Sequence, residues 1–119
     1  TQAPSAVSIT AGNITANFGA EADTLTYGAT TTIDFTGTNL QTVTLTGNVA
    51  FASSNLSAGR CKSIRIIGDS SSRTLSFPAW KFVGSDTPGS LAANKVARLS
   101  LESWGTSDAN VVAFYSAQV

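Results

Sequence analysis

A chain of 119 residues with no net charge and only 12% charged side chains is long enough for one domain and poorly suited to nucleic acid or an anionic membrane. Its apolar content of 42% excludes a disordered chain, and the absence of histidine excludes Ser-His-Asp and Cys-His catalysis and most zinc sites. Serine and threonine, roughly a quarter of the residues, replace the missing charges, which favours surfaces that lose their water cheaply against another protein.

The chain begins with residues 1–29, which we expect to form an extended arm with two short strands at residues 7–10 and 14–18. Residues 30–119 are expected to form one compact β-module. The sequence contains no methionine. Either an initiating methionine was removed or the chain is a piece of a longer protein, and both alternatives stay open.

Strand patterns sharpen after residue 30. Residues 32–36 place Ile33 and Phe35 on one face, and residues 42–46 alternate threonine with apolar side chains. A short run at residues 49–51 follows a compact Gly-Asn turn. These patterns predict short strands with an apolar inner face and a neutral, hydroxyl-bearing outer face.

The clearest pattern of strands and a turn lies between residues 61 and 77. Two alternating runs, residues 61–67 and 73–77, flank a cluster of glycine, aspartate and serine at residues 68–72. Two such runs around a turn cluster predict a β-hairpin with one apolar side. Asp69 is expected to form the turn by accepting backbone hydrogen bonds. The residues expected in the core of the module are Ile64, Ile66, Leu75, Phe77, Trp80, Phe82, Leu99 and Leu101.

Two further strands complete the pattern. Residues 95–103 place Ala97 on the inner face and Arg98 and Glu102 on the outer face, whereas residues 111–115 are apolar on both faces, as in a strand covered on both sides. The total is about eight short strands at intervals of about ten residues, which predicts an all-β fold, either an antiparallel β-sandwich or a jelly-roll-like barrel. No internal repeat of about 20–50 residues is visible.

No catalytic, metal-binding or cofactor-binding residues are expected. The seven acidic residues show no pairing of the kind that glycoside hydrolysis requires. Cys61 has no candidate base and is expected to be a small core or interface residue; as the single cysteine, it also favours a chain folded in a reducing compartment. No apolar run reaches the roughly 18 residues of a transmembrane helix. The sequence therefore predicts a protein that is not an enzyme.

Basic residues gather in the central stretch, with Asp69 as their only acidic neighbour. One interpretation is a solvated face with local ion pairs, and another is a basic patch that meets an acidic protein surface. The two tryptophans are expected to pack in the core or in a subunit interface, with a sugar-binding platform as the alternative. The candidate interface residues are Arg60, Lys62, Arg65, Arg73, Lys81, Trp80 and Trp104.

Several segments resemble a module found in virion proteins of tailed bacteriophages. They are residues 31–51 (TTIDFTGTNLQTVTLTGNVAF), 54–60 (SNLSAGR), 64–84 (IRIIGDSSSRTLSFPAWKFVG), 90–95 (SLAANK) and 105–115 (GTSDANVVAFY). The resemblance covers residues 30–119. It implies a non-enzymatic β-fold, usually trimeric, at the virion exterior, and it carries over no catalytic residue.

The resemblance leaves more than one role open. The first is a capsid decoration protein, a homotrimer assembled in the host cytoplasm and fastened to the major capsid protein or other virion proteins on the outer shell. The second is the tip of a tail fibre or spike that binds a glycan or protein of the host surface. A third, from another class, is a free carbohydrate-binding module with exposed tryptophans.

Overall fold

A computed structural model describes residues 22–119 of the chain. The strands expected at residues 7–10 and 14–18, and most of the expected arm, lie outside these residues. The described part contains no α-helix; apart from one 3-10 turn, Asp108–Asn110, its regular elements are all strands. The prediction of an all-β fold is confirmed.

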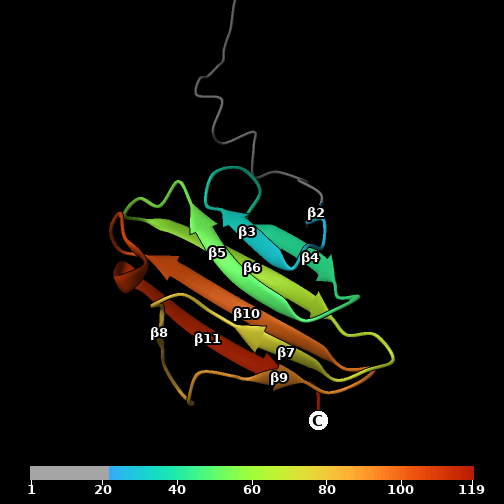
Figure 1. Cartoon of the computed structure of the whole chain (residues 1–119). Coiled ribbons are helices and arrows are strands. Elements are labelled where there is room, and N and C mark those ends of the chain that lie inside the picture. Colours follow the sequence, from blue (N-terminus) through green and yellow to red (C-terminus); the bar gives the residue numbers. More distant parts are fainter. Residues whose placement is uncertain (1–21) are drawn as a thin grey trace, which may run out of the picture.

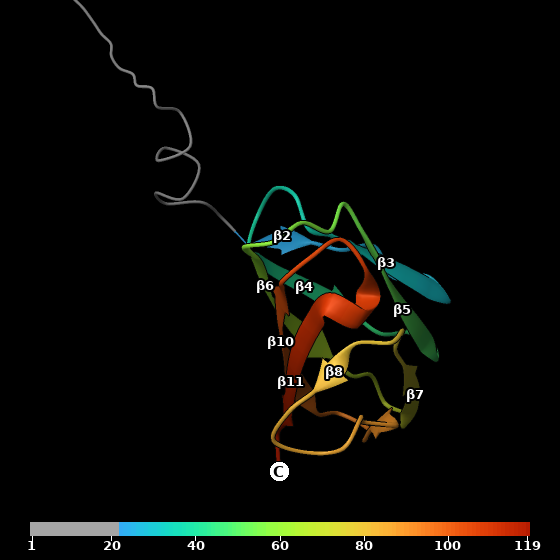
Figure 2. The ribbon, with the colours of Figure 1, turned by 90° about the vertical axis from the view of Figure 1, so that its left-hand side faces the viewer.

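The strands form two sheets that pack face to face as two layers, seen from the front in Figure 1 and from the side in Figure 2. The larger sheet has six strands in the order β2 (Asp23–Thr24), β4 (Leu40–Thr44), β6 (Arg60–Ile67), β10 (Val96–Ser103), β11 (Val111–Ala117) and β8 (Lys81–Phe82). The smaller has four strands in the order β3 (Thr30–Asp34), β5 (Val49–Ser54), β7 (Arg73–Ser76) and β9 (Ser90–Leu91).

In chain order, the strands from β2 to β7 alternate between the two sheets. β2, β4 and β6 lie side by side in the larger sheet, β3, β5 and β7 in the smaller, and both sets are parallel. The chain therefore winds as a coil. Thr30 pairs with Ala50 and Leu40 with Ser63, so one turn takes about 20 residues, at the short end of solenoid repeats. The coil is a structural repeat that the sequence did not reveal, because its residues vary from turn to turn.

The expected antiparallel pairing is only partly correct. β6–β10, β10–β11 and β7–β9 are antiparallel, whereas the other five ladders are parallel. The predicted hairpin is also wrong, because β6 and β7 belong to different sheets. The turn at residues 68–72 carries the chain across the core, where Asp69 accepts hydrogen bonds from Ser71 N at 3.3 Å and Arg73 Nε at 2.9 Å. The apolar faces of the two strands therefore meet across the core instead of side by side.

The core lies between the sheets and follows the predicted alternation. Of the residues expected there, six are buried, whereas Phe77 and Phe82 are half-buried and pack against the core. Phe77 lies among Phe51, Trp80 and Phe82, with ring centroids 5.3, 5.9 and 4.9 Å away. The buried apolar residues are Ile33, Phe35, Val43, Leu45, Val49, Phe51, Ile64, Ile66, Leu75, Trp80, Leu91, Ala97, Leu99, Leu101, Val111 and Ala113.

Candidate functional site

The seven candidate interface residues do not form one surface. Arg65 points outward from the six-stranded sheet, Lys81 is exposed on its edge strand β8, and Trp104 is 67% exposed after the end of β10. Arg60 is half-buried and donates a hydrogen bond to the carbonyl oxygen of Asn55 at 2.6 Å. Arg73 is paired with Asp69, as the interpretation with local ion pairs expects.

Two of the seven residues are buried, so the structure corrects their assignment to an exposed interface. Lys62 lies on the inner face of β6, where its ammonium donates to the carbonyl oxygen of Thr36 at 2.8 Å and to that of Thr38. Burial lowers the pKa of Lys62. Trp80 packs against the aromatic core, and its indole Nε1 donates to Asp108 Oδ1 at 3.0 Å. Core packing, expected as one alternative for both tryptophans, is thus confirmed for Trp80, whereas Trp104 lies outside the core and its alternatives of a subunit interface or a sugar-binding platform stay open.

Cys61 is also exposed, which contradicts its expected place in the core. It occupies an outward position of β6, in the same alternation as Ser63 and Arg65. It lines a small groove of about 340 Å³ with Leu40 and Glu102 at one end of the outer face. The interface alternative for Cys61 therefore stays open.

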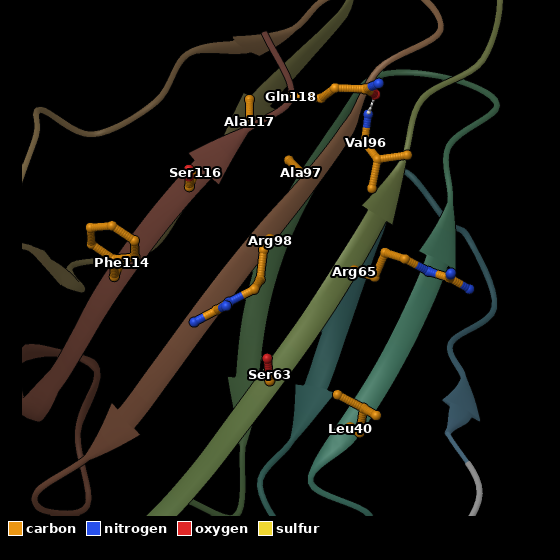
Figure 3. Close-up of a pocket in the computed structure, with 10 residues that line it drawn as sticks. All are labelled: Leu40, Ser63, Arg65, Val96, Ala97, Arg98, Phe114, Ser116, Ala117 and Gln118. Carbon is orange, nitrogen blue, oxygen red and sulfur yellow. Dashed lines mark hydrogen bonds between the residues drawn. The ribbon is translucent and has the colours of Figure 1, made fainter.

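The outer face of the six-stranded sheet carries a groove of about 700 Å³ (Figure 3). Most of the residues that line it occupy outward positions of four adjacent strands, because alternate side chains of a strand point to the same face. Three large apolar side chains on this face are exposed: Leu40 on β4, Val96 on β10 and Phe114 on β11. We call this surface, lined by Leu40, Ser63, Arg65, Val96, Ala97, Arg98, Phe114, Ser116, Ala117 and Gln118, the outer groove.

Two registered rows of side chains run across the outer groove. The first row places Leu40, Ser63, Ser100 and Phe114 next to one another on successive strands. The second row, one step along the strands, places Thr42, Arg65, Arg98 and Ser116 in the same way. The groove therefore has two arginines at its centre, neutral hydroxyl groups beside them and apolar side chains around them.

Arg65 and Arg98 lie directly opposite each other on neighbouring antiparallel strands. Like charges in such a pair destabilise a sheet. Their guanidinium groups point apart in Figure 3, and each makes a neutral contact, Arg65 Nε to Thr42 Oγ1 at 3.2 Å and Arg98 Nε to Ser100 Oγ at 3.3 Å. Among residues 22–119 the only salt bridge joins Arg73 to Asp69, so neither guanidinium of the central pair meets a carboxylate there.

β11 was expected to be covered on both faces. Val111 and Ala113 are buried against the other sheet, but on the opposite face Val112 is half-buried and Phe114 is 42% exposed. The ring of Phe114 lies close to Gly84, where an added Cβ atom would be 2.9 Å from Phe114 Cε1. Within the described chain, β11 is therefore covered on one face only.

Sequence reasoning missed Leu40, Val96, Arg98 and Phe114 as members of one surface. Arg98 was correctly placed on an outer face, but its alignment with Arg65 depends on the register between β10 and β6. Lys62 could have been excluded, because it shares the alternation of Ile64 and Ile66.

The described residues contain no group of three or more His, Cys, Asp or Glu side chains that could hold a metal ion. No helix among residues 22–119 has the length and hydropathy needed to cross a membrane. The arrangement of the outer groove suits the binding of another protein, since it combines exposed apolar side chains, easily desolvated hydroxyls and two arginines that meet no carboxylate in the described part of the chain. Comparisons with protein-family models, curated proteins and solved structures found no match.

Proposed function

We propose that the chain is a non-enzymatic structural protein of a bacteriophage virion, a trimeric capsid decoration protein that docks on the outer shell. The observation that carries the proposal is the outer groove, where Phe114, Leu40 and Val96 stand exposed around two arginines that meet no carboxylate among residues 22–119. Surfaces enriched in aromatic residues and arginine are typical of the centres of protein interfaces.

The resemblance to phage virion modules supports the same role. Its segments 54–60 and 64–84 supply most of β6 and all of β7 and β8, and segment 105–115 supplies much of β11, so they contribute strands to both sheets and part of the core. The trimeric state rests on the resemblance. It is tested by light scattering of the purified protein, in which a monomer at all concentrations would contradict it.

The docking role is tested on phage heads assembled without this chain. We expect the purified protein to bind such heads and to raise the temperature at which they break open, because a ligand that binds only the intact shell stabilises it by mass action. Failure of the purified protein to bind the heads would refute the decoration role.

A tail-fibre or spike tip that binds a host glycan is the second candidate. One observation favours it: Trp104 is exposed, and its indole Nε1 donates to Glu102 Oε1 at 3.3 Å, which places a carboxylate at the edge of an exposed aromatic ring. An exposed aromatic ring of this kind can also serve a free carbohydrate-binding module. If either role is correct, oligosaccharides should quench the fluorescence of Trp104, and Trp104→Ala should abolish binding; adsorption of the protein to host cells would then distinguish the fibre tip.

A further inference from the structure

We infer that the outer groove binds an acidic, extended segment of another virion protein, with two carboxylates placed on Arg65 and Arg98. The inference rests on the proposed function, since it takes the partner to be a protein of the same assembly. It adds the place of docking and the chemistry of the partner.

The charge of the groove selects an acidic partner. Arg65 and Arg98 face each other across the ladder, and the contacts of their Nε atoms in the described chain are with the hydroxyls of Thr42 and Ser100. A guanidinium holds a carboxylate through two parallel hydrogen bonds, which are stronger than hydrogen bonds to neutral groups. Two carboxylates would also remove the repulsion between the paired arginines.

The size of the groove selects an extended segment. It runs from Leu40 on β4 to Phe114 on β11 across three strand spacings, or about 14 Å. About four to five extended residues cover this length. In such a segment the side chains of residues i and i+2 point the same way, about 7 Å apart, which suits two guanidinium groups that start on adjacent strands and diverge (Figure 3).

The walls of the groove select a protein over a phosphate or sulfate group. Leu40 and Phe114 end one row of side chains, and Val96 lies beyond the arginines, so apolar side chains flank the charges on both sides. β6 and β10 each have a paired strand on both sides, so the ladders occupy their backbone amides and leave none to cradle a phosphate. A second copy of the chain in a two-fold contact is disfavoured, because such a contact would place the arginine pair against itself.

The test uses the protein labelled with ¹⁵N and the capped peptide FSESESL, which alternates two glutamates with serine between apolar ends. We expect saturable shifts of the backbone amides of Ser63, Arg65, Arg98 and Ser116 in NMR spectra, and none with the matched peptide FSKSKSL. Arg65→Ser with Arg98→Ser should weaken binding at least about ten-fold, which is the loss of one charge-assisted hydrogen bond. Arg65→Lys with Arg98→Lys should weaken it less, because lysine keeps the charge and loses the paired hydrogen bonds.

The control variant is Thr32→Glu with Thr74→Glu. These threonines are exposed on the four-stranded sheet, and the double change alters the net charge by the same amount as the double serine variant. It should bind the peptide as the unaltered protein does. Thermal unfolding of each variant checks that the fold is kept.

Four outcomes would overturn the inference. The first two are the absence of saturable shifts with FSESESL at millimolar peptide, and equal shifts with FSKSKSL. Another is binding of a sulfated oligosaccharide, but not of the peptide, at the same amides. The fourth is self-association that the double serine variant abolishes, which would make a second copy the occupant.

Phage heads separate this inference from the proposed function. If the unaltered protein binds heads and the double serine variant binds them equally well, the groove is not the docking site, whereas the decoration role stands. If the unaltered protein does not bind heads at all, the decoration role fails whatever the peptide result.

Discussion

The indole Nε1 of Trp80 donates a hydrogen bond to Asp108 Oδ1 at 3.0 Å, and the same carboxylate oxygen accepts a hydrogen bond from Ser53 Oγ. Trp80 precedes β8, Ser53 belongs to β5 and Asp108 begins the 3-10 turn before β11. One acidic side chain therefore ties together segments from both sheets beside the aromatic core.

Loss of this carboxylate should cost stability. Asp108→Ala leaves the buried indole of Trp80 without its acceptor, which is expected to lower the free energy of unfolding by about 1–3 kcal/mol. Asp108→Asn keeps an acceptor oxygen and should lose less. Chemical denaturation followed by tryptophan fluorescence measures both. Asp86→Ala, at an exposed loop position, is the control and should change nothing; equal stability of the Asp108→Ala and Asp86→Ala variants would contradict the prediction.

Removal of the Tyr115 hydroxyl is expected to raise stability, in contrast to the loss of the Asp108 carboxylate. Its hydroxyl is buried, finds no hydrogen-bond partner among residues 22–119, and has its pKa raised by burial. Tyr115→Phe removes a polar group that is buried without a partner and should raise the free energy of unfolding by about 1 kcal/mol.

Tyr27→Phe is the matched control for Tyr115→Phe. The hydroxyl of Tyr27 donates to the carbonyl oxygen of Asn48 at 2.7 Å, so its removal should lower stability by about 0.5–1.5 kcal/mol. Thermal or chemical unfolding of the two variants should therefore move in opposite directions. A loss of stability on Tyr115→Phe as large as that on Tyr27→Phe would show that the hydroxyl of Tyr115 is satisfied in solution.

Lys62 should make stability rise in alkaline solution. The folded protein lowers the pKa of Lys62 from its ordinary 10.5, chiefly through burial, so over the interval between the two pKa values the unfolded chain binds more protons. Stability therefore increases with pH through that interval and is fully gained above pH 10.5. Lys62→Met keeps an unbranched side chain in the core and removes the titration. The unfolding free energy of the unaltered protein, measured relative to Lys62→Met, should rise from neutral pH to pH 10.5, and a constant difference would contradict this.

Asp34 should stabilise the fold in its ionised form, so its contribution to stability should be lost in strong acid. Hydrogen bonds from the hydroxyl of Thr36, the amide of Asn55 and the backbone of Thr36 lower the pKa of Asp34 from 3.8 to about 2. Its contribution to stability is therefore fully present above pH 3.8 and is lost as the pH falls through about 2. Unfolding curves of the unaltered protein and Asp34→Ala should converge over this range. NMR titration of the carboxyl group gives the pKa directly, and an ordinary value would rule out the effect.

The local patterns predicted which side chains point inward, and most of those predictions are correct. Ile33, Phe35, Val43 and Leu45 are buried, as strict alternation requires, because successive side chains of a strand point to opposite faces. The prediction that the seven candidate interface residues form one surface is wrong for a related reason. Its members were grouped by nearness in the sequence, whereas Lys62 shares the inward alternation of Ile64 and only Arg65 faces the outer groove.

By itself the sequence determined that the protein is made of strands and which face of each strand is apolar, because both follow from a period of two residues within single segments. Only the tertiary structure decided which strands are neighbours and in which direction they run. The alternation of β6 and β7 fits a hairpin and a crossing between sheets equally well, and the apolar faces are buried in either case. The meeting of Arg65 and Arg98 across a ladder is a property of register between distant segments, and so the outer groove exists only in the folded chain.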